Sequence, residues 1–194
     1  LDIDFGTYPY VTSSNTSSGQ IFAGTGFGIK ENHKVYGITK AYTTRVGSGP
    51  FPTELDDLIG NHLVTKGQEF GTVTKRKRRC GWLDVNLVKQ SVKISGITDI
   101  VLTKLDVLDE LKTIKVCIGY KINNKEYDYF PFNELEQCAI EPIYETLPGW
   151  NEITYGIKEW DNLPQKAKDY ILYIEKLIET NISIISTGPE RNQT

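Results

Sequence analysis

The sequence predicts a mixed α/β fold, because segments with the two-residue period of a strand alternate with segments that have the period of a helix. Its 194 residues are enough for one domain with a substantial core, or for one domain and part of another. Hydrophobic residues make up 39% of the chain and charges of both signs are mixed along it, which is typical of a soluble globular protein.

The first half of the chain is predicted to hold a loop, a strand and a helix. Residues up to about 25 are rich in Gly, Ser, Thr and Asn, which suits a loop lining a polar site. Residues 24–30 contain glycines but neither the Walker spacing nor GxGxxG, so we expect a turn-rich connection there. Alternating and β-branched residues predict a strand over 38–46, and Thr53 is placed to cap a helix over 54–66.

The second half continues the alternation. Four apolar residues at helical spacing, followed by Gly96, predict a helix over 84–94, and a strand over 100–105 comes next. Residues 113–122 and 126–130 predict a hairpin, because the two residues that separate the strands are asparagines that suit a tight turn.

The end of the strand over 100–105 carries the most informative motif, Thr103-Lys104-Leu105-Asp106. A carboxylate at this position can accept two hydrogen bonds from guanine, one from the ring N–H and one from the exocyclic amine, while the lysine stem lies flat on the base. Adenine offers no such pair of donors, and leaving the carboxylate unpaired would cost roughly 1–3 kcal/mol per unmet group. A solvated turn is the alternative interpretation of these four residues.

A second segment near the C-terminus supports the guanine interpretation. A helix with one apolar face is expected over about 164–180. A short buried strand over 182–185 then leads into Ser186-Thr187-Gly188-Pro189, where Gly permits close backbone approach and Pro stops the strand. Such a turn can offer hydroxyl and N–H groups to the other edge of a base. Together the two segments predict two walls of a purine pocket.

Five consecutive cations, Lys75-Arg76-Lys77-Arg78-Arg79, stand in a chain of net charge −3, so the positive charge is concentrated in one place. No internal partners are evident from the sequence, and such a loop is usually solvated and mobile until an anion arrives. The hydroxyls of Thr72 and Thr74 precede it, and the apolar run that begins at Cys80 anchors it. We therefore expect a loop that captures a carboxylate or phosphate, with an exposed charged turn as the alternative.

The cysteines, the histidines, the apolar runs and the absence of methionine indicate which compartment and which kinds of site to expect. The three cysteines, Cys80, Cys117 and Cys138, form no CxxC pair or metal-ligand cluster, which favours a reducing cytoplasm. His33 and His62 are expected in surface or loop positions rather than in catalysis. No apolar run is long enough for a transmembrane helix, and the first residues lack the features of a secretory signal. The absence of methionine leads us to expect an internal piece of a longer protein.

These residues belong to a longer set of motifs that resembles the adenylosuccinate synthetase family, GTP-dependent ligases of purine nucleotide synthesis. Several long motifs in one order are far more specific than any one of them. The motifs run through essentially the whole chain: YPYVTSSNT at 8–16, AY at 41–42, TRVG at 44–47, GPFPTE at 49–54, RRCGWLD at 78–84, LTKLDVLD at 102–109, EPIYETLPGW at 141–150 and IISTGP at 184–189.

The resemblance implies a reaction in which GTP phosphorylates an oxygen of inosine monophosphate (IMP) and L-aspartate then displaces the phosphate. It implies IMP contacts by Thr12 and Arg76, with Val46 beside the ribose. It also implies an aspartate-binding loop and a GTP site. The loop would be formed by Thr72, Val73, Thr74, Lys75, Arg76, Lys77 and Arg78, and the GTP contacts by Arg78, Lys104, Leu105, Asp106, Ser186, Thr187 and Gly188.

Two departures from the family pattern stand out. The aspartate loop of the family usually reads Thr-Thr-Gly before the first Arg, whereas this chain has Val73-Thr74-Lys75. The loss of one hydroxyl and of the flexible Gly would change loop closure or aspartate affinity. The family's phosphate loop, with its catalytic Asp and His and its Mg²⁺ contacts, is not in this sequence, so we assign neither a catalytic residue nor a metal ligand to these residues.

The sequence therefore predicts the C-terminal part of a large, P-loop-like nucleotide-binding ligase fold. Residues 1–45 would belong to the central nucleotide-binding sheet and residues 46–194 to a mixed α/β C-terminal domain. By resemblance the complete enzyme uses GTP and Mg²⁺, is cytoplasmic and forms a homodimer, and this piece alone is expected to be inactive. One alternative is a stand-alone guanine-nucleotide-binding domain, and the other is a nucleic-acid-binding module built on residues 75–79. The net negative charge of the rest of the chain argues against the nucleic-acid-binding module. We expect neither nucleic acid nor a membrane as a partner.

Overall fold

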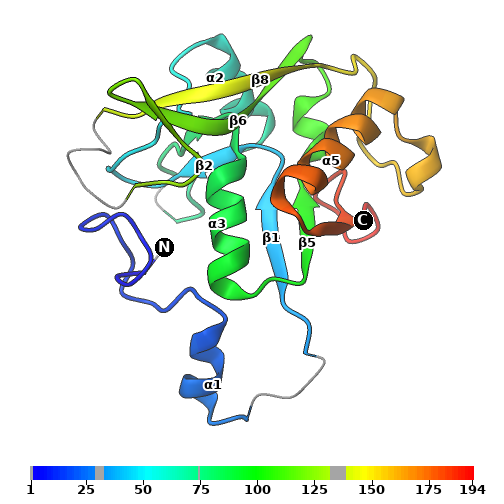
Figure 1. Ribbon diagram of the computed structural model, residues 1–194. Helices are drawn as coiled ribbons and strands as arrows, with labels where there is room; N and C mark the ends of the chain where they lie inside the picture. Colours follow the sequence, from blue (N-terminus) through cyan, green and yellow to red (C-terminus); the bar gives the residue numbers. More distant parts are fainter. Residues whose placement is uncertain (1, 29–32, 74, 132–138) are drawn as a thin grey trace.

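The computed structural model describes residues 2–28, 33–73, 75–131 and 139–194, and it confirms the mixed α/β class (Figure 1). The helices of the described residues are α1 (Gly19–Thr25), α2 (Leu58–Lys66), α3 (Val85–Ser95) and α5 (Gln165–Ile178), with the 3-10 turns η1 (Leu105–Leu108) and η2 (Trp160–Asn162). The strands are β1 (Tyr36–Lys40), β2 (Thr43–Arg45), β3 (Arg79–Gly81), β4 (Leu83–Asp84), β5 (Asp99–Thr103), β6 (Thr113–Ile122), β7 (Lys125–Tyr127), β8 (Glu141–Pro148) and β9 (Asn181–Ile185).

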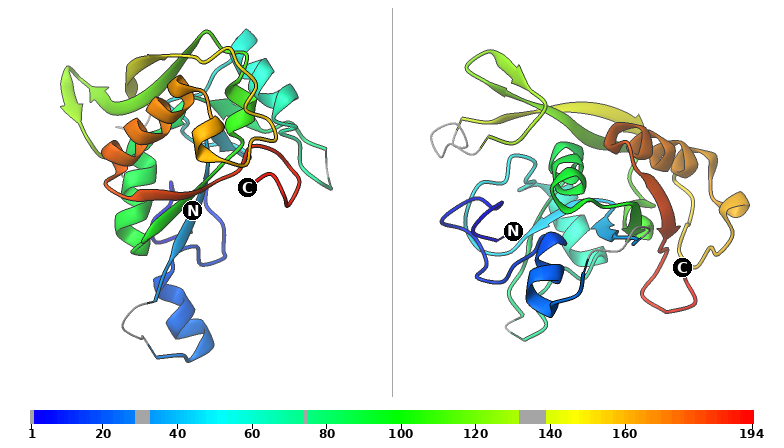
Figure 2. Two further views of the ribbon diagram at one scale, coloured as in Figure 1. Left: turned by 90° about the vertical axis from the view of Figure 1, so that its right-hand side faces the viewer. Right: turned by 60° about the horizontal axis from the view of Figure 1, so that its bottom comes forward.

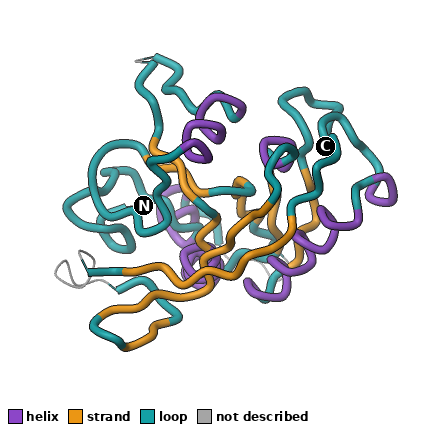
Figure 3. Tube along the Cα trace, turned by 90° about the horizontal axis from the view of Figure 1, so that it is seen from above, coloured by secondary structure: helices purple, strands orange, loops and turns teal. Residues whose placement is uncertain are grey.

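A parallel sheet in the order β1-β5-β9 carries the motifs singled out in the sequence. Strand β5 lies in its middle, and Ile100 and Leu102 are buried there at 1% and 0% exposure. Because all three strands run in one direction, the loops that follow β1, β5 and β9 meet at a single edge of the sheet. Seen from above, strands run through the middle of the molecule and some of them extend to its edge (Figure 3).

The second sheet is built around the long strand β6, which pairs with β4, β7 and β8. The predicted hairpin is confirmed. Asn123 and Asn124 both have positive φ values, 50° and 64°, which is the backbone of the tight turn that fits the twist of two antiparallel strands. This sheet crosses one end of the molecule above α3 and β5 (Figure 1).

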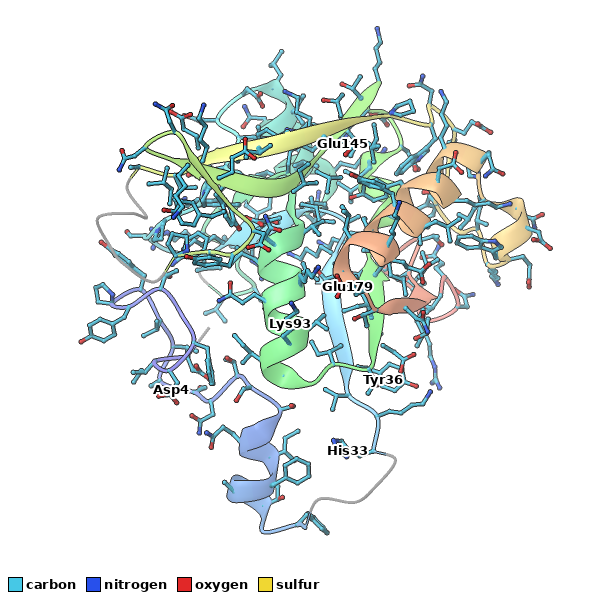
Figure 4. The ribbon with its side chains drawn as sticks, viewed as in Figure 1. Asp4, His33, Tyr36, Lys93, Glu145 and Glu179 are labelled. Carbon is cyan, nitrogen blue, oxygen red and sulfur yellow. The ribbon has the colours of Figure 1, made fainter. Side chains whose placement is uncertain are left out.

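Helices α3 and α5 form where the apolar spacing predicted them. Asp84 caps α3 by accepting a hydrogen bond from the Leu87 N–H at 3.2 Å, and Gly96 ends the helix in the left-handed conformation. The end of α5 lies beside α3 (Figure 4), where Lys89 forms an ion pair with Glu179.

Helix α2 begins later than predicted, and Thr53 is not its cap. Asp57 takes that place and accepts a hydrogen bond from the Gly60 N–H at 2.9 Å. The reason is long-range pairing, because Glu54 forms a β-bridge with Gly81 and the Leu55 N–H donates to the Cys80 carbonyl at 2.9 Å. Residues 54 and 55 are therefore held in extended backbone, and the helix cannot start before Asp57.

The single strand predicted over 38–46 is wrong, because the chain forms two strands there. Ala41 and Tyr42 separate β1 from β2, and both are buried at 1% and 2% exposure. Strand β1 pairs with β5, whereas β2 pairs with β3, so the chain changes sheets at these two residues. The sequence analysis also missed α1, which projects from the rest of the molecule and buries none of its residues (Figure 2).

Asp84 is a buried carboxylate within the main core, with 1% of its surface exposed. Burial raises its pKa to about 6, although hydrogen bonds from the Tyr120 hydroxyl and the Leu87 N–H stabilise the charged form in part. Tyr120 belongs to a small apolar cluster with Cys117 and Phe130. The large core cluster has as its largest fully buried members Trp150, Tyr42, Tyr170, Leu63, Leu83, Ile100, Leu102, Leu105, Leu108, Ile114 and Ile171.

We predict that Asp84 makes the protein less stable as the pH rises from about 4 to about 6. The folded-state pKa of about 6 lies above the value of about 3.9 for an unfolded aspartate, so the folded protein binds a proton that the unfolded chain releases. The contribution of this carboxyl is therefore complete below about pH 4 and is lost as the pH passes 6. Urea unfolding of the wild type and of Asp84→Asn across this range measures it.

The expected difference in slope between the two proteins is about 1 kcal/mol per pH unit. The amide keeps an acceptor for the Leu87 N–H and the Tyr120 hydroxyl, so the variant is a conservative one. Asp56→Asn, which changes an exposed aspartate, serves as the control and should keep the wild-type slope. Parallel pH profiles for the wild type and Asp84→Asn would contradict the assignment.

Candidate functional site

The structure brings the two predicted walls of a base pocket to the same edge of the parallel sheet. Lys104 follows β5 in the left-handed conformation with φ of 60°, and Leu105 begins η1 fully buried. The Ser186 N–H donates to the Leu102 carbonyl at 2.8 Å, and the Leu105 N–H donates to the Ser186 carbonyl at 3.4 Å. Residues 104–106 and 186–188 are therefore neighbours through their backbones, as parallel pairing of β5 with β9 requires.

Asp106 lies half-buried in the first turn of η1, and burial is the main cause that raises its pKa. The cleft next to it has a rigid floor, because the buried Asp109 accepts hydrogen bonds from Trp150 Nε1 at 2.8 Å and from the Thr154 N–H at 2.9 Å. The other residues that line this cleft are Lys66, Glu110, Asn151, Glu152, Ile153 and Tyr155.

The turn over 186–188 uses its hydroxyls within the fold. Thr187 Oγ1 donates to the Ile157 carbonyl at 2.8 Å, and Ser186 Oγ donates to the Gly188 carbonyl at 3.0 Å. A Cβ at position 188 would lie 2.2 Å from Gln193 Oε1, so a larger residue there would require the end of the Gln193 side chain to move. The sequence led us to expect hydroxyl and N–H groups for a ligand here, but the hydroxyls and the N–H groups of Ser186 and Thr187 all donate within the fold.

Glu69 lies at the centre of the described site, and sequence reasoning missed it. Its side chain is fully buried, and Oε1 accepts hydrogen bonds from Tyr42 at 2.6 Å and from Lys104 Nζ at 2.8 Å. Oε2 accepts from Arg78 Nη1 at 2.9 Å, and Lys40 Nζ lies 2.9 Å from both oxygens. Burial opposes ionisation, yet these donors outweigh it and lower the pKa of Glu69 to about 2.

The expectation that the five cations have no internal partners is wrong for the end of the run. Arg78 pairs with Glu69, and Arg79 pairs with Glu54 and donates to the Gly49 carbonyl at 2.9 Å. Lys77 Nζ donates to Asn61 Oδ1 at 2.9 Å. The sequence did not reveal these contacts because each partner lies nine or more positions away in the chain.

The base of the loop is closed by backbone bonds. The Gly71 N–H donates to the Arg76 carbonyl at 2.8 Å and the Lys75 N–H donates to the Gly71 carbonyl at 2.9 Å. Lys75 has a positive φ of 53°, so it adopts the backbone for which the family pattern has Gly. Val73 is 92% exposed, as is expected of a loop tip, and Thr72 is exposed as well. Thr74 lies outside the described residues.

Thr12 and Val46, predicted to contact the same ligand, line one cleft together with Tyr10, Thr44 and Arg45. Arg45 ties the two sides of this cleft: its Nη2 donates to Thr7 Oγ1 at 2.8 Å and its Nε donates to the Ser48 carbonyl at 3.1 Å. Arg76, the third residue assigned to that ligand, does not line this cleft.

Glu69, Lys40, Tyr42 and Arg45 are thus the site residues that sequence reasoning did not select. No signal in the sequence singles out Glu69, which lies six positions before the first of the five cations. Among the described residues no three His, Cys, Asp or Glu side chains form a group that could hold a metal ion. None of the helices that the structure describes is both long and apolar enough to cross a bilayer.

Comparison with known proteins identifies the relatives of this chain. The family model described as adenylosuccinate synthetase matches residues 1–194. The solved structure of fully ligated adenylosuccinate synthetase from Plasmodium falciparum is 47% identical, with a TM-score of 0.95, and the match covers 100% of this chain and 46% of that one. Succinoaminodeoxyadenylate synthetase of cyanophage S-2L, solved with dGMP and dATP bound, is 16% identical with a TM-score of 0.55 over 99% of this chain and 42% of that one, which shows a shared fold. The chain thus spans less than half the length of either protein.

We predict that Arg45→Lys loosens the wall formed by residues 7–12. A lysine cannot reproduce the separate hydrogen bonds of Nη2 and Nε, so Thr7 and the Tyr10 carbonyl lose a donor that now holds them to β2. Hydrogen exchange at the amides of residues 7–12 should become about tenfold faster, which corresponds to roughly 1.4 kcal/mol of local stability. Arg191→Lys, in an exposed arginine outside the cleft, is the control. Equal exchange in wild type and Arg45→Lys would show that Arg45 does not hold this wall.

Proposed function

Because this chain belongs to the adenylosuccinate synthetase family, a family of ligases of purine biosynthesis, we propose that it forms part of an enzyme that joins L-aspartate to IMP at the expense of GTP. The products would be adenylosuccinate, GDP and phosphate. The observation that carries the proposal is the meeting of residues 104–106 and 186–188 at one sheet edge, with Glu69 linking Lys104 to Arg78.

Guanine recognition is proposed for Asp106. Its carboxylate would accept hydrogen bonds from the ring N–H and the exocyclic amine of guanine, while the stem of Lys104 lies along the base and Leu105 supports both from below. Ser186, Thr187 and Gly188 would lie against the other edge of the base. The half-buried position of Asp106 supports this role, because a partly desolvated carboxylate gains most from two matching donors.

The other substrates are proposed to bind on the neighbouring elements. Residues 72–78 would close over the carboxylates of L-aspartate, with Arg76 shared with IMP and Arg78 shared with GTP. Thr12 and Val46, which line one cleft, would contact IMP, with Val46 next to the ribose. Arginine suits these contacts because its planar guanidinium can form two parallel hydrogen bonds with a carboxylate or phosphate.

Enzymes of this family use Mg²⁺ with GTP, and Mg²⁺ would neutralise charge on the phosphates. Among the described residues no three His, Cys, Asp or Glu side chains come together as a set of metal ligands, and we assign no step of the reaction to Mg²⁺ here. We further propose that residues 1–45 belong to the central sheet domain and 46–194 to the C-terminal domain, and that the complete enzyme is a cytoplasmic homodimer.

A nucleic-acid-binding role for the basic run is less well supported. A nucleic-acid surface needs cations that are free to contact successive phosphates. Here Arg78 and Arg79 are engaged with Glu69 and Glu54, and Lys77 with Asn61. The run therefore has the character of a loop fixed at its C-terminal end, which suits the capture of one small anion.

We predict that Asp106→Asn abolishes the preference for guanine nucleotides. The amide cannot accept both hydrogen bonds of guanine, and its NH₂ group matches the 2-oxygen of xanthine instead. The affinity for GTP should fall by about tenfold or more, at 1–3 kcal/mol per unmet group, while that for xanthosine triphosphate rises. Calorimetric titration of the wild type and the variant with both nucleotides measures this. The wild type should also prefer GTP to ATP, and an unchanged ratio of GTP to xanthosine triphosphate affinity in the variant would refute the role of Asp106.

We also predict that residues 1–194 alone bind guanine nucleotide but do not synthesise adenylosuccinate. Phosphoryl transfer needs a phosphate cradle, a bound metal ion and a positioned base, and the residues assigned here supply substrate contacts only. Adenylosuccinate formation from IMP, GTP and L-aspartate, followed by absorbance, is the measurement. Turnover close to that of a full-length enzyme of the family would place the chemistry within this chain.

A further inference from the structure

We propose that Glu69 is a positioning residue that couples recognition of the guanine base to binding of the dicarboxylate substrate. Its buried carboxylate touches both Lys104, next to the proposed base, and Arg78, in the proposed aspartate loop. The inference rests on the proposed function and goes beyond it, since neither substrate needs to touch Glu69.

The contacts divide between the two carboxylate oxygens. Oε1 holds Lys104 at 2.8 Å, and Oε2 holds Arg78 at 2.9 Å. Lys40, at 2.9 Å from each oxygen, and the Tyr42 hydroxyl, at 2.6 Å from Oε1, fix the carboxylate from the side of β1. The group therefore cannot rotate to follow one partner without changing its contact with the other.

The charged groups around Glu69 carry a net positive charge, which favours the binding of an anion. Three cations surround one carboxylate, and their side chains are 23%, 31% and 34% exposed for Lys40, Arg78 and Lys104. The Nε of Arg78 is buried and has no hydrogen-bond partner among the residues that the structure describes. Glu69 engages Nη1 of Arg78, and because 31% of this side chain is exposed, the outer part of the guanidinium can take a second carboxylate or a phosphate.

This arrangement predicts positive coupling between the two substrates. When Arg78 binds the carboxylate of an incoming substrate, it shares its positive charge between that ligand and Glu69. Glu69 then interacts more strongly with Lys104, whose Nζ is also bonded to the Gly67 carbonyl at 2.5 Å. The lysine stem is held more firmly as a platform for the base. By thermodynamic linkage, nucleotide binding must favour dicarboxylate binding by the same factor.

The test is the coupling factor, which is the Kd of L-aspartate without GDP divided by its Kd with saturating GDP, measured by calorimetry in the presence of IMP. We expect a factor of about 5 or more for the wild-type chain. Glu69→Gln should reduce it to about 1, because a neutral amide no longer links the two cations electrostatically. Glu69→Asp keeps the charge at a shorter reach and should restore part of the coupling.

Glu54→Gln is the matched control. Glu54 also neutralises an arginine at the end of the basic run, Arg79, but it does not contact Lys104. This variant should keep the wild-type coupling factor. If Glu69 only stabilised the fold, Glu69→Gln would lower the free energy of unfolding and weaken the binding of both GDP and L-aspartate, but GDP would still strengthen the binding of L-aspartate. The coupling factor therefore distinguishes a positioning role from a structural one.

If Glu69→Gln does not fold, a double-mutant cycle with Lys104→Met and Arg78→Met replaces it. The inference requires that Lys104→Met weaken L-aspartate binding, and that this effect disappear in the Arg78→Met background. Additive effects in the cycle, or a wild-type coupling factor in Glu69→Gln, overturn the inference while nucleotide binding persists. A wild-type chain that binds neither GDP nor L-aspartate overturns the proposed function, and the coupling with it.

Discussion

The arrangement of the site depends on the burial of one negative charge at Glu69. A carboxylate removed from water loses several kcal/mol of hydration, so it is stable only when donors surround it. Its donors come from the end of β1, from the bend at Tyr42, from the residue after β5 and from the residue before β3. Ionised Glu69 therefore sets the spacing between the sheet edge and the basic loop.

The same principle fixes the floor of the cleft next to Asp106. Asp109 is 5% exposed and satisfies its carboxylate with the Trp150 indole and with both the N–H and the hydroxyl of Thr154, at 2.8, 2.9 and 2.6 Å. These bonds tie the segment after β8 to the turn after β5. Asp106, three positions earlier, has the freer carboxylate of the two. Asp109 therefore stabilises the fold, whereas the carboxylate of Asp106 is available for a ligand.

Sequence reasoning succeeded where the determining contacts are local. The apolar spacing of α3, its end at Gly96 and the paired asparagines of the β6–β7 hairpin are all properties of short segments, and each formed as predicted. It failed where distant backbone decided the outcome, as in the pairing of Glu54 with Gly81 that delays α2. The proximity of residues 104–106 to 186–188 was predictable because parallel strands share an edge. The partner of Arg78 was not, because nothing in the sequence distinguishes Glu69 from the other acidic residues.

Two lysines adopt a left-handed backbone conformation, and in each case a contact offsets the backbone strain. Lys104 and Lys75 have φ values of 60° and 53°, a conformation that costs a residue other than Gly about 1 kcal/mol. At Lys104 the ion pair with Glu69 offsets this cost and directs the side chain along the sheet edge. At Lys75, where the family pattern has Gly, the backbone bond to Gly71 holds the same geometry. A lysine explores fewer backbone conformations than a glycine, so the loop of this chain would lose less conformational entropy in the closure proposed for it.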